Sequence, residues 1–279
     1  MRVLSDDYNG AGDKVNILPV LRLLQQMGHE VHTHLQPPSI YENTGIKPYI
    51  AGIPYDAKLP CSFEAEKTVP ADLILKRIKD GTGIDLTGQY GPGLAFSEEE
   101  MDFIEMKKAL EYVMVFPYTN VAQKAIHPNI ARAIVQFLLG KGFNVCTSPA
   151  GFDNNKYPWR EVFEGARFMN MYPYFDRRWL LDIAGARLNV CLDGGPFNVS
   201  LATGVNTVGL LGVADKRLAQ LYPPEQWRVS QSTIECSPCF KCVASDEPGK
   251  INGCLHPTQP CGEHFDLEDV FKKIEELLW

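Results

Sequence analysis

The sequence has no long apolar run, no apolar N-terminal segment and no excess of positive charge. No stretch approaches the roughly 20 apolar residues that are needed to cross a bilayer. Residues 1–7 lack the apolar core of a signal peptide. The formal net charge of −7 weighs against a general binder of phosphate backbones, although it leaves a local basic groove open. We therefore expect a cytoplasmic protein without a membrane span.

Internal repeats and low-complexity segments are also missing from the sequence. Its 279 residues are 45% hydrophobic and 22% charged, which is ordinary for a globular protein and long enough for two small domains. We place a domain boundary near residue 110, which gives a domain of residues 1–110 and a domain of residues 111–279.

The eight cysteines are distributed unevenly. In a reducing cytoplasm they are not expected to form a disulfide framework. Three are dispersed along the chain, and we expect them to pack as small apolar side chains. These three are Cys61, Cys146 and Cys191.

The other five cysteines crowd into residues 236–261. Thiolates in C-x-x-C spacing, followed by later cysteines, can form a tetrahedral site for zinc or iron, and the ligand type does not choose between these metals. A single tetrahedral ion needs only four ligands. By spacing we favour Cys236, Cys239, Cys254 and Cys261, with Cys242 as a substitute. The metal would be structural, holding a loop with little core of its own, and the alternative is a set of free thiols.

Short apolar runs alternate with amphipathic stretches over most of the chain. The pattern predicts strands at residues 2–4, 30–34, 112–116, 144–146, 187–192 and 207–211. It predicts helices at residues 15–27, 101–110, 129–139, 176–184, 197–203 and 266–278. Between residues 37 and 97 prolines and glycines recur, and only residues 72–79 read as a helix. Alternating strands and helices predict a parallel sheet covered on both faces.

Two glycine-rich turns each follow a strand-like run and precede a helix. One is Gly10-Ala11-Gly12-Asp13, and the other is Asp193-Gly194-Gly195-Pro196. Glycine lets the main chain approach a ligand closely. The start of the next helix offers unpaired N–H groups and a partial positive charge to an anion. Two such turns in one chain suggest two nucleotide-binding halves that face a shared cleft.

These motifs resemble those of glycosyltransferase family 9, the ADP-heptose lipopolysaccharide heptosyltransferases. Residues 10–13 running into residues 17–22 (ILPVLR) are similar to the family's opening, G-x-G-D … P-A-L-R. Residues 116–120 (FPYTN), followed by Lys124, are similar to its donor-phosphate loop with an essential lysine. Residues 193–212 follow D-[TS]-G-P-x-H-x-A-A-x-G-x-P-T-V-x-L-x-G almost element by element. The resemblance is good from about residue 110 onward, fair over residues 1–34 and poor between.

The chain departs from the family pattern at three points. Gly194 stands where the family has a hydroxyl residue, and Asn198 stands where it has a histidine. The N-terminal half is also much shorter than in a typical heptosyltransferase. We expect these departures to leave anion binding intact and to affect the choice of sugar and base.

The resemblance implies an α/β fold of the GT-B type, with two Rossmann-like domains, parallel sheets and a reduced N-terminal domain. Residues 1–110 would face the acceptor, and residues 111–279 would bind the nucleotide sugar and carry the cysteine-rich loop 236–261. Some relatives that glycosylate autotransporter proteins carry a four-cysteine iron-binding finger in this region. The cysteine segment resembles that finger.

The implied activity is metal-independent, inverting transfer of a sugar from a nucleotide donor. Asp13 matches the family's catalytic base, although it also fits a simple helix cap. The residues that match its donor site are Gly12, Thr119, Asn120, Lys124, Asp193, Gly194, Gly195, Pro196 and Phe197. Lys124 offers a compact charge for a diphosphate, and Asp193 is expected to organise its turn because a carboxylate repels phosphate.

The acceptor stays open between a saccharide, a protein side chain and a modified nucleobase, and a homo-oligomer is compatible with the sequence. The alternative hypothesis is a protein that retains the glycosyltransferase fold without catalysis. Such a protein would be a metal-binding scaffold or a nucleotide-binding protein.

Overall fold

The structure is a computed structural model of the 279-residue chain. It describes residues 1–6, 11–34, 37–60, 79–80, 86, 93–117, 125–148, 159–168, 176–239, 243–244, 251–252 and 260–279.

The N-terminal part of the chain forms a small parallel sheet with the order β3-β2-β1-β4. Its strands are β1 (Arg2–Asp6), β2 (Glu30–Thr33), β3 (Lys47–Pro48) and β4 (Ala57–Pro60). Helix α1 (Ala11–Gln26) connects β1 to β2, and the 3-10 helix η1 (Pro38–Ile40) lies between β2 and β3. This is a β-α-β opening, as the apolar pattern of the first 34 residues predicts.

The second sheet has six parallel strands in the order β10-β9-β8-β5-β6-β7. The strands are β5 (Tyr112–Phe116), β6 (Asn144–Thr147), β7 (Arg167–Phe168), β8 (Leu188–Leu192), β9 (Thr207–Leu211) and β10 (Trp227–Gln231). Helix α3 (Glu98–Lys108) lies on the connection between the two sheets, before β5. The helices of the part with the second sheet are α4 (Pro128–Gly140), α5 (Trp159–Val162), α6 (Arg177–Ala184), α7 (Gly195–Thr203) and α8 (Leu267–Leu278). Shorter pieces are η4 (Lys216–Ala219), η5 (Pro260–Glu263) and an antiparallel pair, β11 (Val243–Ala244) with β12 (Ile251–Asn252).

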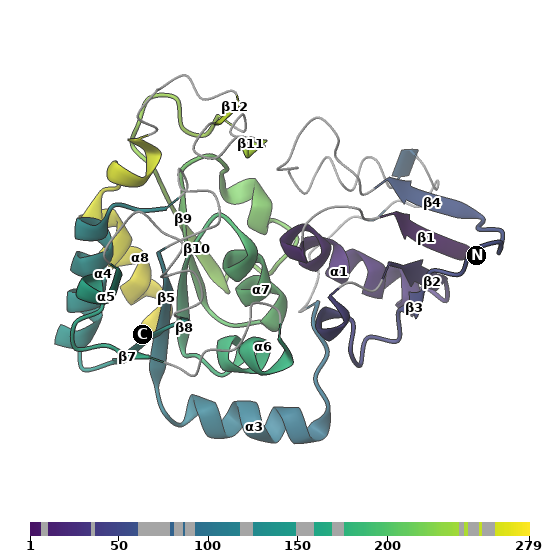
Figure 1. Ribbon diagram of the computed structural model, residues 1–279, viewed down its shortest axis with the longest axis horizontal. Coiled ribbons are helices and arrows are strands. Elements are labelled where there is room, and N and C mark those ends of the chain that lie inside the picture. The colour runs from purple at the N-terminus through teal and green to yellow at the C-terminus, as the bar shows by residue number, and fades with distance from the viewer. Residues whose placement is uncertain are drawn as a thin grey trace.

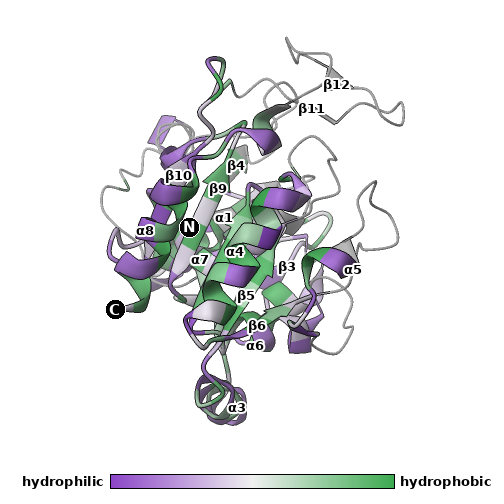
Figure 2. Ribbon diagram, turned by 90° about the vertical axis from the view of Figure 1, so that its left-hand side faces the viewer, coloured by the Kyte–Doolittle hydropathy of each residue, from purple (hydrophilic) through white to green (hydrophobic). Residues whose placement is uncertain are grey.

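Both faces of the second sheet are covered, because successive side chains of a strand point to opposite faces. Val113 and Val115 of β5 pack in one apolar cluster with α4 and α8. Met114 and Phe116, the alternate residues, pack in a second cluster with α6 and α7. In Figure 2 the strands of this sheet are coloured mostly hydrophobic, whereas the outer helix α8 carries much hydrophilic colour.

Helices α1 and α7 pack against each other between the two sheets (Figure 1). Leu18 and Leu21 of α1 belong to the same apolar cluster as Phe197 and Leu201 of α7, and all four are buried. The two sheets therefore share one continuous core. The structure thus has the α/β architecture with two parallel sheets that the sequence predicts.

The start of α3 is fixed by hydrogen bonds between residues that lie three positions apart in the sequence. The Ser97 hydroxyl accepts a hydrogen bond from the backbone N–H of Glu100 at 3.3 Å, and the Ser97 N–H donates to Oε2 of Glu100 at 2.8 Å. This reciprocal pair is a capping box, which satisfies N–H groups that the helix itself cannot pair. It confirms the predicted helix start.

The main differences from the expected elements lie at the edges of the sheets. The predicted strands and helices outside residues 37–97 are confirmed, with ends shifted by a few residues. Strand β10 was not expected, because its half-exposed sequence WRVSQ mixes apolar and polar residues, as an outer strand can. Strands β3 and β4 lie in the segment expected to be irregular, and the predicted helix 72–79 falls outside the described residues except for its last position. The division into domains near residue 110 stays a prediction.

The described helices include none with the length and apolar character needed to cross a bilayer. The dispersed cysteines Cys146 and Cys191 are buried, and burial raises the pKa of their thiols to about 11 and about 12. Such thiols are poor nucleophiles at neutral pH, which agrees with the expected packing role. Cys61 lies outside the described residues.

The close packing of α7 against β9 leads to a prediction about the stability of the fold. A Cβ atom added at Gly209 of β9 would lie 2.6 Å from Cε2 of the buried Phe197 ring. We expect Gly209→Ala to lower the free energy of unfolding by about 1–3 kcal/mol, measured by urea denaturation, because the core must shift. Gly140→Ala is the matched control, since a Cβ at Gly140 meets no atom within 4 Å and should cost nothing. Equal stability of both variants would contradict this close approach.

Candidate functional site

The order of the second sheet defines a topological switch point at its carboxyl edge. The chain runs outward from β5 through β6 to β7 and then returns to form β8 on the other side of β5. Ligands of open parallel sheets bind outside the carboxyl ends of the strands at such a switch point. Phe116 of β5 is paired with Cys191 of β8, so the loops after these two strands leave the sheet side by side.

These two loops are the ones singled out in the sequence. The loop after β5 carries Thr119, Asn120 and Lys124, which lie outside the described residues. Its two flanks are joined, because Ile126 N–H donates to the Pro117 carbonyl at 3.2 Å. The loop after β8 is the turn of residues 193–197. The register of β5 and β8 brings the starts of the two motifs together.

The turn after β8 leads directly into α7. Gly194 has extended backbone geometry, and α7 begins at Gly195 with Pro196 in its first turn. Its first intrahelical bond runs from Asn198 N–H to the Gly194 carbonyl at 3.2 Å. By helix geometry the N–H groups of Gly195 and Phe197 have no intrahelical acceptor, and Pro196 has no N–H. Two backbone donors and the positive end of the helix dipole thus lie at the switch point.

Burial separates the roles of the residues in this turn. Gly194, Gly195 and Pro196 are half-buried, whereas Asp193 is 7% exposed and Phe197 is fully buried. The Phe197 ring belongs to the core, so this residue can serve an anion only through its backbone. Asp193 is enclosed at the base of the turn, a position that suits the organising role expected for it.

The departures from the family motif occupy two different environments. Asn198 is 7% exposed, so the position of the family's histidine is largely enclosed. A Cβ at Gly194 would meet no atom within 4 Å, so the position of the hydroxyl residue has free space around it.

The first glycine-rich turn leads into α1. This helix begins at Ala11, so Gly12 and Asp13 are in its first turn; their side chains lie outside the described part of the structure. Figure 1 shows the N-terminal end of α1 directed toward the second sheet, and α1 packs on α7. Leu94 N–H also donates to the Ala202 carbonyl at 3.0 Å, which ties the connection between the sheets to α7.

Two hydroxyl groups at the switch point were not singled out in the sequence. Thr147 and Ser148 end β6 on the other side of β5, are 0% and 3% exposed, and have hydroxyl oxygens without a hydrogen-bond partner in the described structure. Their signal in the sequence is polar residues directly after the apolar run at 144–146. A strand end at this edge is a place for ligand contacts.

The two ends of the cysteine segment meet at the carboxyl end of β9. The Ser237 hydroxyl, between Cys236 and Cys239, donates to the Gly212 carbonyl at 2.6 Å. At the other end of the segment, a Cβ at Gly212 would lie 2.8 Å from Cβ of Cys261. Cys242 and Cys254 lie outside the described residues. The described part contains no group of three or more potential metal ligands, so the placed thiols do not form a complete site by themselves.

The cysteine segment also contacts the loop that follows β5. His127 N–H donates to the Gly262 carbonyl at 2.8 Å, and Gly262 follows Cys261 directly. The end of the cysteine segment therefore braces the flank of the loop that carries Lys124.

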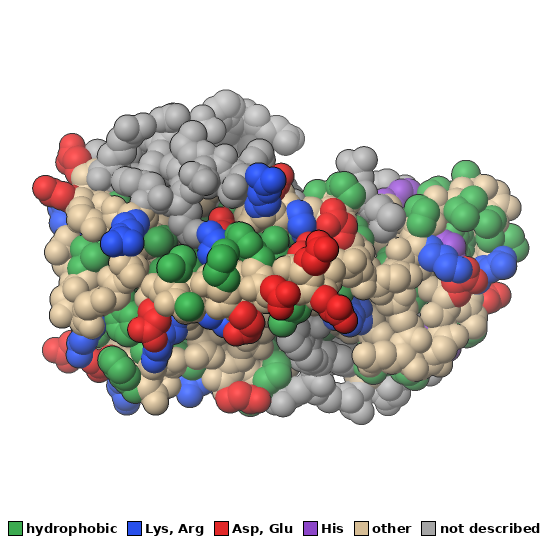
Figure 3. Space-filling view, turned by 90° about the horizontal axis from the view of Figure 1, so that it is seen from below, with side chains coloured by type: hydrophobic (Ala, Val, Ile, Leu, Met, Phe, Trp, Pro, Cys, Tyr) green, Lys and Arg blue, Asp and Glu red, His purple; other side chains and the backbone are tan. Residues whose placement is uncertain are grey.

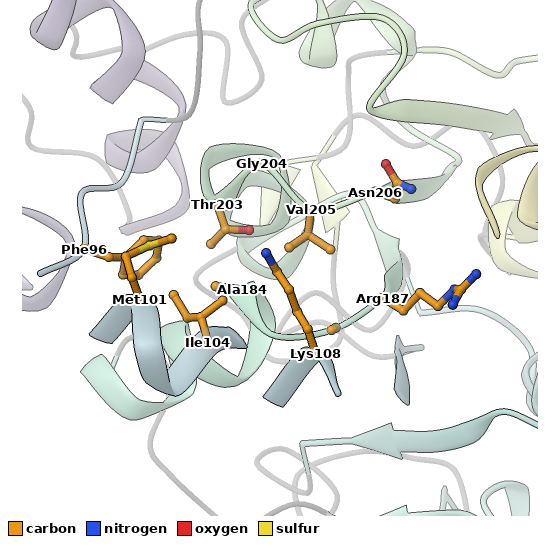
Figure 4. Close-up of a pocket in the computed structure, with 11 residues that line it drawn as sticks. Phe96, Met101, Ile104, Lys108, Ala184, Arg187, Thr203, Gly204, Val205 and Asn206 are labelled. Carbon is orange, nitrogen blue, oxygen red and sulfur yellow. The ribbon is translucent and has the colours of Figure 1, made fainter. Parts of the chain in front are cut away.

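A cavity of about 390 Å³ lies at the opposite, amino edge of the second sheet (Figure 4). It lies between α3 and the residues that precede β8 and β9, and Lys108 extends across it. Lys108 is itself paired with Glu105 at 2.7 Å. Seen from below, Figure 3 shows acidic side chains prominent on the face where α3 lies. This cavity does not coincide with the turn at residues 193–197.

The comparisons in sequence return no match, either to a family model or to a curated protein. Solved structures match in fold. The glycosyl transferase family 9 structure from Veillonella parvula DSM 2008 matches with a TM-score of 0.66 at 14% identity, covering 99% of this chain and 97% of that chain. Escherichia coli heptosyltransferase WaaC with ADP matches with a TM-score of 0.60 at 15% identity, covering 100% and 99%. The iron-containing dodecameric glycosyltransferase TibC from enterotoxigenic E. coli H10407 matches with a TM-score of 0.61 at 14% identity, covering 99% and 78%.

The chain has a GT-B-like fold. At 13–15% sequence identity, the similarity to these solved structures establishes the architecture alone. The structural neighbours of this chain are family 9 heptosyltransferases and glycosyltransferases.

The free space at Gly194 gives a test of the turn. We expect Gly194→Ser to leave the free energy of unfolding within about 0.5 kcal/mol of the parent, because its Cβ meets nothing and its φ of 167° is open to any residue. Gly212→Ser is the contrasting variant and should be destabilised, since its Cβ would meet Cys261. Chemical denaturation measures both. A large loss in Gly194→Ser would show that the turn is more crowded than described.

Proposed function

We propose that the protein is an inverting glycosyltransferase that uses a nucleotide sugar as its donor. The observation that supports the proposal is the pairing of β5 with β8 in a GT-B-like fold, because Phe116, where the segment similar to the donor-phosphate loop begins, is paired with Cys191, close to the turn at residues 193–197. One of the similar solved structures is WaaC with ADP, and another is TibC in complex with ADP-D-β-D-heptose. An ADP-sugar is therefore the first donor to test.

The donor's diphosphate would lie against the start of α7. The amides of Gly195 and Phe197 would donate to its oxygens, and Lys124, Thr119 and Asn120 of the neighbouring loop would add a positive charge and hydrogen bonds. These groups stabilise the negative charge that grows on the diphosphate as its bond to the sugar breaks. No metal ion is needed for this step.

Asp13 would act as the general base. Its carboxylate takes the proton of the acceptor hydroxyl while that oxygen forms a bond to the anomeric carbon and the diphosphate leaves from the opposite side. Inversion follows from this single displacement. Support comes from the position of Asp13 in the first turn of α1, the helix that packs on α7. The acceptor is a hydroxyl of a saccharide, a protein side chain or a modified nucleobase.

The clustered cysteines would hold a structural zinc or iron ion. Support comes from the meeting of both ends of the segment at Gly212 and from the iron that the structurally similar TibC contains. Cys236, Cys239, Cys254 and Cys261 would bind the ion, with Cys242 as a substitute. Its role would be to fix the segment that braces the loop after β5.

The function is tested with nucleotides and one variant. We expect an ADP-sugar to stabilise the protein in a thermal-shift panel that also contains UDP- and GDP-sugars, by about 2.7 kcal/mol at a concentration of 100 Kd. Asp13→Asn should keep this shift and lose about 100-fold to 10,000-fold in turnover, because only the base is removed.

Asp102→Asn, an exposed carboxylate on α3, is the matched control and should stay active. No shift with any nucleotide sugar would instead favour a scaffold without catalysis. A fully active Asp13→Asn would reassign the base.

The metal is tested by elemental analysis of the purified protein. We expect about one equivalent of zinc plus iron, and we expect Cys239→Ser to reduce it, because a tetrahedral site loses one of four thiolates. Cys146→Ser, a buried cysteine outside the segment, should keep the metal content of the parent. Less than about half an equivalent in the parent protein would remove the metal from the proposal.

A further inference from the structure

Arg177, the first residue of α6, joins three segments that are far apart in the sequence. Its Nε and Nη2 donate to the two carboxylate oxygens of Glu100 at 2.6 and 2.7 Å. Its Nη1 donates to the Ser39 carbonyl at 2.8 Å, and Nη2 also donates to the Ala95 carbonyl at 2.5 Å. The guanidinium lies 5.0 Å from the centre of the Phe96 ring, and the side chain is only 13% exposed.

The three segments belong to different parts of the fold. Ser39 lies in η1, next to the first sheet, and Glu100 lies in α3, on the connection between the sheets. Arg177 itself lies on α6, which covers the second sheet. Two more residues of the first part join the cluster, since Asn43 Nδ2 donates to Glu100 at 3.1 Å and Glu42 lies 3.3 Å from Arg177.

The Glu100 carboxylate is both fixed in position and ionised. It is the second member of the capping box with Ser97, so its position is tied to the start of α3. The hydrogen bonds from Arg177 lower the pKa of Glu100 below its ordinary value. The pair is therefore ionised at neutral pH, and a bidentate pair fixes orientation as well as distance.

The other large contact between the two parts has a different character. The interface of α1 with α7 is apolar, and apolar burial is non-directional. Packed helices can slide past each other by small shear movements at little cost. A planar guanidinium with acceptors on both sides of the interface resists such sliding, because its hydrogen bonds fail when the geometry changes.

We propose that Arg177 is a positioning residue that sets how the part carrying Asp13 sits against the part carrying the turn at residues 193–197. This rests on the proposed function, in which the base and the donor come from these two parts. Displacement of a reacting group by 1 Å can reduce the rate about 100-fold. Loss of the arginine would then slow transfer while leaving the donor half, and hence nucleotide binding, intact.

The test compares Arg177→Lys with Arg187→Lys. Lysine keeps the charge at residue 177, but its three N–H donors are too few for the four hydrogen bonds that Arg177 makes. Arg187 is the matched control, because its partners Glu111, Leu278 and Phe143 all belong to the part that contains the second sheet. We expect kcat to fall about 10-fold to 100-fold in Arg177→Lys, with the Kd for the nucleotide sugar within about twofold. Arg187→Lys should change both values less than about twofold.

Hydrogen exchange gives a readout that does not depend on activity. In Arg177→Lys, amides of residues 39–44 and 94–101 should exchange faster, while those of β5, β8 and β9 keep their protection. Should this variant fail to fold, Glu100→Gln replaces it, since glutamine also completes a capping box and removes the charge that pairs with Arg177. We expect the same changes in smaller measure.

A kcat in Arg177→Lys equal to that of Arg187→Lys would overturn the proposal, as would a loss of nucleotide affinity that parallels the loss of kcat. Unchanged exchange at residues 39–44 would overturn it as well. An inactive parent protein that binds no nucleotide sugar would instead refute the proposed function, and the exchange result would still decide whether Arg177 holds the two parts together.

Discussion

The parallel pairing of β5 with β8 is the contact on which the candidate site depends. The two strands are far apart in the sequence, and their register brings Phe116 level with Cys191. Because β6 and β7 lie on one side and β9 and β10 on the other, the loops after β5 and β8 have no strand between them. Pro117, which follows β5, and the start of α7, which follows β8, therefore belong to neighbouring strand ends.

The surrounding structure supports that edge from two directions. Phe197 anchors α7 against Gly209 of β9, so the first turn of the helix is fixed relative to the sheet. On the other side, the Gly262 carbonyl, at the end of the cysteine segment, accepts a hydrogen bond from His127 N–H, and Cys261 lies close to Gly212. A metal in that segment would act through these contacts, as a brace for a binding loop, and would have no part in the transfer step.

Among the described residues, a broad apolar contact and a compact polar cluster join the two parts of the molecule. The contact of α1 with α7 buries apolar side chains of both parts, and the hydrogen bonds of Arg177 fix the orientation of one part relative to the other. A reaction that takes its base from one part and its donor from the other needs both. Burial alone would hold the parts together without fixing their alignment.

The local elements were largely predictable, for reasons that particular residues show. Ser97 and Glu100 carry the capping box of α3 in their spacing, and the continuous apolar run of residues 112–116 fits a strand buried on both faces. Strand β10 was missed because an outer strand needs no clear apolar pattern. The hydroxyls of Thr147 and Ser148 were missed because their place at the site follows from strand order. The Arg177 cluster could not be predicted, since half of its hydrogen bonds go to backbone carbonyls, which no side-chain pattern records.

The sequence by itself determined the alternation of strands and helices, the two glycine-rich helix starts and the clustering of five cysteines, because these depend on periodicity and spacing along the chain. Only the tertiary structure decided which strands are neighbours, and therefore that β5 and β8 end side by side. It also decided that the Phe197 side chain lies in the core and that a side chain at residue 194 would meet open space. Strand order and burial are set by contacts between residues distant in the chain, and local sequence does not encode them.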